Sequence, residues 1–352
     1  MSLKHAAIDL TLRGLGGARR LAPDWMRGLG AILMFHHVRP WRARAAAPNR
    51  ELEITPEFLD ETLQLLKRRG VAIVTLDAAV ERLAAAARGE PAGDPFVALT
   101  FDDGYRDNLE WALPILKRER APMTLFVTTG FAAREAGLWW VEAEEALLRA
   151  GSLDVTLAGR RLTLPTANAA QKATAGARLM AALRALPQDD VDEAVAGLAR
   201  EHGVDGRALT GELCLDWAEL TQIAAEPLVT IGAHTRTHPM LATLDEGRAR
   251  SEIADARIEI EARLGRPVRH LAYPVGSPAA AGTREFRLAR EAGYASAVTT
   301  RPGMLFAEHA GHLHALPRLS INGRHQSLEA VDALLTGAPF LMWNRGRRAN
   351  VA

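Results

Sequence analysis

The chain has 352 residues, of which 48% are hydrophobic and 24% charged, with a net charge of +1 and a single cysteine, Cys214. These values are typical of one large globular domain or about two average ones. They exclude a collagen-like, low-complexity or wholly disordered chain. One cysteine excludes an intramolecular disulfide framework and a zinc site built from cysteines. Because the net charge is close to zero, no overall field favours nucleic acid, and we expect no nucleic-acid partner.

Basic residues gather at the two ends of the chain. Residues 1–44 hold eight Lys and Arg against two Asp, and Arg345, Arg347 and Arg348 lie near the end. This leaves open a peripheral contact with an anionic membrane surface, although a solvated polar surface is the simpler interpretation. No run reaches the roughly 18 apolar residues of a spanning helix, and the start lacks the ordered regions of a signal peptide. We therefore expect a cytoplasmic protein, acting in solution or at the inner face of the membrane.

Apolar runs that predict strands alternate along the chain with periodic segments that predict helices. The predicted helices are 1–28, 56–69, 77–87, 107–120, 217–225, 245–264 and 284–292. The predicted strands are 31–35, 71–74, 96–101, 123–128, 229–233, 270–273 and 295–299. Thr55 before Pro56 predicts a capped helix start, and Gly70 predicts its end. Almost wholly apolar strands alternating with helices indicate parallel strands covered on both faces.

The alternation breaks between Gly130 and about Asp216. This stretch is rich in Ala, Arg and Glu, has helical spacing, and contains one β-like piece over 153–164. We interpret it as an insertion carried on a barrel. The predicted organisation is a basic helical segment, a barrel in two parts, a mostly helical insertion, and a C-terminal helix with a basic tail. Their respective bounds are 1–30, 31–130 with 216–330, 131–215, and 331–352.

Two adjacent carboxylates, Asp102 and Asp103, end the predicted strand 96–101. Burying two anions at a strand end is costly unless something pairs with them, and a metal ion is one such partner. Gly104 allows the chain to turn sharply away from the strand. The alternative is a helix cap made by Asp103 or Asp107.

Two histidines four residues apart, His234 and His238, follow the predicted strand 229–233. Both reach one cation if the segment turns. Two imidazoles and one carboxylate form a common open metal set, which leaves positions for water and substrate. The remaining carboxylate is then free to act as general base on that water. The two clusters together suit metal-assisted hydrolysis.

These motifs make the chain resemble the polysaccharide deacetylases of the NodB-homology type, carbohydrate esterase family 4. Asp102 and Asp103 in TFDDGY match the first motif of that family, and His234 and His238 in HTRTH match the second. The resemblance covers about residues 31–130 and 216–322 and leaves out the insertion.

The resemblance implies an α/β fold, a distorted (β/α) barrel with about seven parallel strands. It implies a divalent metal, usually zinc, held by Asp103, His234 and His238, with Asp102 as general base. The implied reaction is hydrolysis of an acetamido sugar, which releases acetate and leaves a free amine on a glycan, oligosaccharide or lipid-linked precursor. The implied partner is therefore an N-acetylated carbohydrate.

The chain departs from the third motif of the family, Arg-x-x-Pro-Tyr. Here Tyr273 precedes the proline, Val275 takes the tyrosine place, and Arg269 does not have the family spacing. We assign Tyr273 to the site, with a packed strand end as the alternative. Arg318 is expected to pair with Asp102 in place of the missing arginine and keep it ionised, with a surface arginine as the alternative.

The acid that protonates the leaving amine is not assigned by any motif. The candidates are His309, His312 and His314, in the loop before Arg318. His36 and His37 also follow a predicted strand, so one of them could reach the site, and His36 is the one we consider. Trp139 and Trp140 open the insertion, and their indoles suit either a sugar ring or core packing.

Three other functions remain open at this point. The same barrel would also suit hydrolysis of a non-sugar amide, because the chain differs from the family in the third motif and in the final motif, which usually supplies a histidine as general acid. A non-catalytic glycan-binding descendant and a purely structural Asp–His network are the others. A spare carboxylate beside a metal set weighs against the glycan-binding descendant, which has no need of it.

Overall fold

The computed structural model describes residues 24–351. Most of the predicted helix over 1–28, and of the segment 1–30, therefore lies outside the described residues. Its described part contains one short helix, α2 (Asp24–Arg27).

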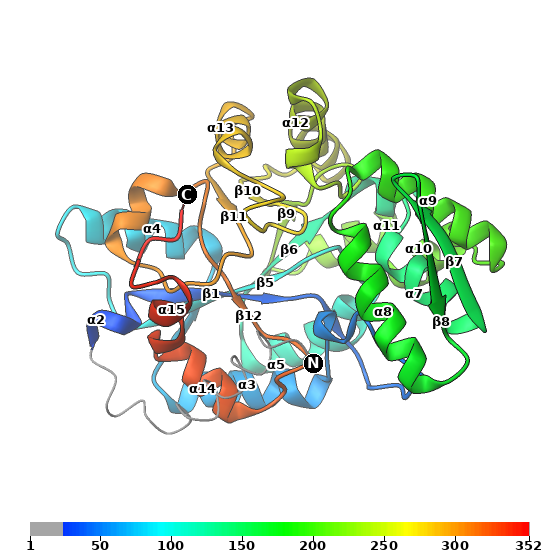
Figure 1. The fold of residues 1–352 in the computed structure, drawn as a ribbon. Coiled ribbons are helices and arrows are strands. Elements are labelled where there is room, and N and C mark those ends of the chain that lie inside the picture. The colour runs from blue at the N-terminus through cyan, green and yellow to red at the C-terminus, as the bar shows by residue number, and fades with distance from the viewer. Residues whose placement is uncertain (1–23, 352) are drawn as a thin grey trace.

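One parallel sheet organises the chain into an open, distorted barrel, as predicted (Figure 1). Within the described residues seven strands follow the order β11-β10-β9-β6-β5-β1-β12, and β4 pairs with the start of β5. Their bounds are β1 (Gly30–Phe35), β4 (Ala72–Val74), β5 (Phe96–Phe101), β6 (Met123–Val127), β9 (Val229–Ala233), β10 (His270–Ala272), β11 (Ser296–Val298) and β12 (Leu319–Ser320). All seven predicted strands pair in this sheet, with bounds close to the predicted ones. The predicted strand 71–74 corresponds to β4, which lies off the main strand order.

The strand registers bring the polar segments to one edge of this sheet. Phe35 pairs with Phe101 at the ends of β1 and β5, and Val127 pairs with Ala233 at the ends of β6 and β9. Residues that follow these strands therefore emerge at the same carboxyl edge, where barrels of this type place their sites.

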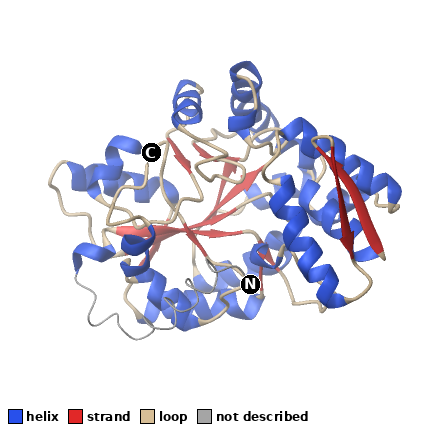
Figure 2. Cartoon of the chain, viewed as in Figure 1, coloured by secondary structure: helices blue, strands red, loops and turns tan. Residues whose placement is uncertain are grey.

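Helices cover the outer face of the sheet because each presents one apolar side to it (Figures 1 and 2). In α3 (Pro56–Arg68) the Thr55 hydroxyl accepts from the Phe58 N–H, which confirms the predicted cap. The remaining barrel helices are α4 (Leu76–Ala87), α5 (Leu113–Glu119), α11 (Trp217–Ala224), α12 (Glu246–Leu264) and α13 (Thr283–Glu291). The predicted helix over 107–120 begins with a π-helical turn, η3 (Asn108–Ala112), before α5.

The segment between β6 and α11 builds a second body beside the barrel (Figure 2). It has its own apolar core. Its elements are α6 (Thr129–Ala132), α7 (Trp139–Arg149), β7 (Ser152–Leu157), β8 (Arg160–Pro165), α8 (Ala169–Leu183), α9 (Gln188–Glu201) and α10 (Gly206–Leu213). The predicted β-like piece is an antiparallel hairpin of β7 and β8. Tyr105 and Met240 of the barrel pack into the same core, so the insertion is anchored beside the strand ends.

The chain ends in two helices where the sequence predicted one. They are α14 (Leu328–Leu335), which packs on α3, and α15 (Ala338–Trp343), which contacts α2. The short elements that the sequence did not predict are β12 and also β2 (His37–Val38), β3 (Glu53–Ile54), η2 (Arg50–Leu52), η4 (Leu241–Thr243) and η5 (Ala307–His312). No helix among the described residues has the length and apolarity to cross a bilayer.

Candidate active site

Asp102 and Asp103 both turn into the barrel mouth from the end of β5. The Asp102 N–H donates to the Phe35 carbonyl at 3.0 Å, so strand pairing continues to the first carboxylate. Asp103 and Gly104 then have φ values of 71° and 66°. A left-handed aspartate is uncommon, and such backbone persists where surrounding structure fixes it, often at functional sites. The two carboxylates are each 2% exposed.

His234 and His238 meet Asp103 in one buried cluster. His234 Nε2 lies 3.3 Å and His238 Nε2 lies 3.4 Å from Asp103 Oδ1. The turn between the histidines contains Thr235 and His238 with φ values of 64°, and the Thr235 hydroxyl accepts from the His238 N–H. The structure thus brings together the three residues that the sequence proposes as metal ligands, with ligand atoms within 4.8 Å of one another.

The donor atoms of this cluster fit a divalent cation. Asp103 Oδ1 is buried and has no hydrogen-bond partner, although two imidazole nitrogens point at it. His234 Nδ1 lies 2.7 Å from the Ala272 carbonyl, so it carries the proton and leaves the Nε2 lone pair free. Burial alone would raise the pKa of Asp103, but the two histidines hold that pKa well below its usual value. An ionised carboxylate with two imidazole nitrogens is a set that zinc prefers.

Arg318 holds the second carboxylate. Its Nη1 and Nη2 atoms donate to Oδ1 and Oδ2 of Asp102, both at 2.7 Å. The Thr100 hydroxyl and the Thr299 carbonyl accept the remaining donors that the structure pairs. Burial raises the pKa of Asp102, but Arg318, together with His234 and His36, outweighs it and lowers that pKa overall. Asp102 is therefore ionised and fixed, with the arginine partner expected from the sequence.

His36 is the histidine that reaches this carboxylate. Its Nε2 lies 4.0 Å from Asp102 Oδ2, and its side chain lines the cavity above the cluster. Burial lowers the pKa of His36, against the pull of Asp103 and Asp102. His37 points the other way, where its Nδ1 meets Asp107 Oδ2 and its ring stacks on Tyr105.

The other candidate histidines lie elsewhere. His309 bonds to the backbone of Phe306, and His314 Nε2 lies 2.8 Å from the Tyr294 carbonyl. None of His309, His312 and His314 lines the cavity. The loop before Arg318 therefore supplies no acid to the site in this structure.

The third-motif region contributes backbone and an apolar wall. The Tyr273 hydroxyl donates to the His314 carbonyl at 2.9 Å, and this tyrosine is outside the cavity lining. Its place is the packed strand end that the sequence left as the alternative, so we leave Tyr273 out of the mechanism. Val275 does line the cavity, with a φ of 60°. Arg269 lies just before β10, at the end of that strand away from the site. Its Nε donates to Asp77 there.

A cavity of about 950 Å³ opens over the cluster. Trp139 and Trp140 of the insertion form one wall of it. The Trp140 ring centroid lies 4.6 Å from that of His238, and its Nε1–H donates to the Tyr105 hydroxyl at 3.2 Å. The sequence left open whether the tryptophans pack in the core or face a sugar ring. The structure is compatible with both, since they are buried and also line the cavity.

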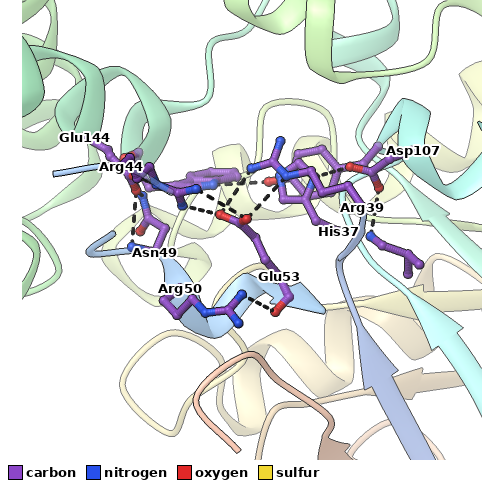
Figure 3. A network of polar contacts seen from close by, with 11 residues as sticks. His37, Arg39, Arg44, Asn49, Arg50, Glu53, Asp107 and Glu144 are labelled. Atoms are coloured by element: carbon purple, nitrogen blue, oxygen red, sulfur yellow. Dashed lines mark hydrogen bonds and ion pairs between the residues drawn. The ribbon is translucent and has the colours of Figure 1, made fainter. Parts of the chain in front are cut away.

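A polar network fixes the helix that carries these tryptophans (Figure 3). Arg44 bridges Glu53 of β3 and Glu144 of α7. The Asn49 amide donates to Glu144 Oε2 and to the Trp140 carbonyl, both at 2.8 Å. The insertion is therefore held to the barrel directly beside the Trp140 wall. No motif in the sequence pointed to this network.

Comparison with known proteins agrees with this geometry. The family model for polysaccharide deacetylase matches residues 89–297, which is more than half of the chain. The chain belongs to this family. No curated protein matched the sequence.

Solved structures show the same fold at low sequence identity. A Streptococcus pyogenes deacetylase, PplD, in complex with acetate has 18% identity and a TM-score of 0.56, over 87% of this chain and 96% of that one. IcaB from Ammonifex degensii has 17% identity and a TM-score of 0.55, over 87% and 97%. A de-N-acetylase from Aggregatibacter actinomycetemcomitans has 14% identity and a TM-score of 0.51, over 87% and 99%.

Proposed function

We propose that this protein is a metal-dependent hydrolase that removes the acetyl group from an acetamido sugar. The observation that carries the proposal is the buried cluster of Asp103, His234 and His238 beside an Asp102 carboxylate held by Arg318. Family membership supports the reaction class. The titles of similar structures, which name deacetylases, point the same way.

Asp103, His234 and His238 would hold the cation, and zinc fits their two nitrogens and one carboxylate best. When bound, a divalent cation polarises the amide carbonyl and lowers the pKa of water. The two histidines are already oriented by the turn after β9 and by the Ala272 carbonyl. Little rearrangement is therefore needed to bind the ion.

Asp102 is the group that takes the proton from the attacking water. It is ionised and buried, and it lines the cavity. Its two oxygens are both engaged by Arg318, which fixes the direction of the remaining lone pairs. Arg318 is thus a positioning residue, since its contacts are with Asp102 and the barrel backbone.

His36 is the group placed to give a proton to the leaving amine. It faces the cavity from the end of β1, on the Asp102 side of the cluster. A side chain near a general base but separate from it can complete the proton transfer as general acid. Trp139 and Trp140 exclude water from one side of the cavity and offer flat faces to a sugar ring.

The direct test is acetate release from a panel of N-acetylated mono- and oligosaccharides. Wild type should release acetate, lose this activity in a chelator, and regain it when zinc is restored. Asp102→Asn keeps the shape of the side chain and should show no such release. Acetate release by the metal-depleted protein, or by Asp102→Asn at the wild-type rate, would contradict the proposal.

A further inference from the structure

The cavity over the cluster extends well beyond the space that one sugar ring needs. At about 950 Å³ it lies near the upper end of the roughly 300–1,000 Å³ found for drug-sized ligands. The Asp102 and Asp103 carboxylates line it, together with Trp140. The same cavity continues past Ile321, after β12, to the two C-terminal helices. A second part of the ligand therefore has room on the side away from the insertion.

The polar side chains of Asn322, Arg324 and His325 line the cavity after β12, whereas the wall beyond them is apolar. It is formed by Val331 and Leu334 of α14, by Phe340 and Trp343 of α15, and by Pro302. A hydrated glycan chain, whose surface is mostly hydroxyl groups, would gain little from this wall and would lose hydrogen bonds to water there. An alkyl chain gains about fourfold in affinity for each methylene that it buries.

The outer surface beside this apolar end has the chemistry of a membrane interface. Trp25 of α2 is 50% exposed and Met342 of α15 is 59% exposed. Arg347 and Arg348 follow α15, and the Arg348 guanidinium lies 5.4 Å from the Trp25 ring centroid. Exposed apolar tips among arginines suit the region where acyl chains meet anionic headgroups. Phe340 lines the cavity from the same short helix that carries Met342.

We propose that the substrate is a glycolipid, in which the acetamido sugar lies at the Asp103–His234–His238 cluster and the lipid chain lies against α14 and α15. This inference rests on the proposed deacetylase function and narrows its substrate class. The apolar chain contributes binding at a distance from the reacting amide. It therefore selects lipid-linked sugars over free oligosaccharides.

The test compares methyl and octyl glycosides of N-acetylglucosamine and N-acetylgalactosamine, below the concentration at which the octyl compounds form micelles. Acetate release gives kcat/KM for each. We expect the zinc-loaded wild type to prefer the octyl over the methyl glycoside by at least about tenfold, since burying two methylenes already gives about 16-fold. Trp343→Ala and Leu334→Asn should each reduce this preference at least about fivefold.

The ratio of the two kcat/KM values does not depend on the fraction of folded enzyme, so partial loss of folding in Leu334→Asn does not obscure it. Trp111→Ala is the matched control, because Trp111 is 43% exposed and is outside the cavity lining. Its ratio should stay within about twofold of wild type. Equal kcat/KM values for octyl and methyl glycosides would overturn the glycolipid proposal and leave the deacetylase function standing. Acetate release from none of the four compounds would count against both.

Discussion

At the scale of single residues, the site depends on two neighbouring carboxylates that have different partners. Asp102 is paired with a cation of the chain itself, Arg318, whereas Asp103 faces the ring nitrogens of two histidines and has an unpaired oxygen. This difference separates their roles, since Asp102 can accept a proton and Asp103 can bind a metal ion.

The Asp102–Arg318 pair should couple strongly in stability. Arg318→Met leaves the Asp102 carboxylate buried and unpaired, and we expect a loss of about 3–5 kcal/mol in the free energy of unfolding. Adding Asp102→Leu removes the uncompensated charge and should recover part of that loss. Urea unfolding of the two single variants and the double variant measures the coupling. Simple additivity of the two losses would show that the pair does not act as a unit.

His36 should matter to turnover and not to metal binding. His36→Gln removes the proposed acid, and we expect kcat to fall by about 10²- to 10⁴-fold with an unchanged metal content. His312→Gln is the control, because His312 is exposed and does not line the cavity. A His36→Gln variant with wild-type kcat would remove His36 from the mechanism.

The sequence predicted the principal site residues but not which of two adjacent histidines faces the cavity. Asp102, Asp103, His234 and His238 were found because buried strands end directly before them. The strand before His36 and His37 is buried on both sides, so its pattern carries no information about direction. The partner that decides the question, Asp107, lies 70 residues further along the chain.

At the scale of elements, the insertion helix α7 is fixed to the barrel by one polar network. Asn49 connects to both Glu144 and the Trp140 backbone, and Arg44 adds an ion pair to Glu144 (Figure 3). The position of the Trp140 wall therefore depends on a loop that precedes α3 in the chain.

Loss of this connection should affect substrate binding more than chemistry. Asn49→Ala leaves buried acceptors unpaired, and we expect the free energy of unfolding to fall by about 1–3 kcal/mol and KM to rise more than kcat falls. Asn168→Ala is a matched control, since Asn168 caps α8 within the insertion and its loss costs about 1 kcal/mol. The control should keep the wild-type KM. An unchanged KM in the Asn49→Ala variant would show that the network does not influence substrate binding.

Asp77, in the first turn of α4, should make the free energy of unfolding depend on pH in the acid range. His270 and then Arg269 lower the pKa of Asp77 from 3.8 to about 2. A carboxyl with a lowered pKa adds stability above its unfolded pKa, and this is lost as the pH falls through about 2. With partial exposure of the pair allowed for, we expect Asp77→Asn to lose about 1 kcal/mol at pH 7. This difference should shrink between pH 4 and pH 2 in urea titrations, and a constant difference would contradict the assignment.

The elements that the sequence missed are short or depend on distant pairing. The strands β2, β3 and β12 have two residues each, which is too short for a periodic pattern. The π-helical turn η3 adds no unusual residue to an otherwise helical segment. The other strands and the helices of the barrel were predictable because each lies in an apolar or periodic run of the sequence.

At the scale of the whole molecule, the cavity joins three parts of the chain. The barrel supplies Asp103 and both histidines, the insertion supplies Trp139 and Trp140, and the C-terminal helices supply the apolar end. The chemistry is thus set by strand ends, whereas the two added parts shape the space for substrate. Their shape could not be predicted from the sequence, since it depends on how separate bodies pack.

The most direct test of the account is metal content by elemental analysis after loading with zinc, in wild type, Asp102→Asn and His234→Ala. We predict about one zinc per chain in wild type and in Asp102→Asn, because Asp102 is engaged by Arg318 and is not a ligand. His234→Ala should retain much less zinc, since an open site of this type has three protein ligands. Wild type without bound zinc, or His234→Ala with a full equivalent, would contradict the central claim that Asp103, His234 and His238 form a metal centre.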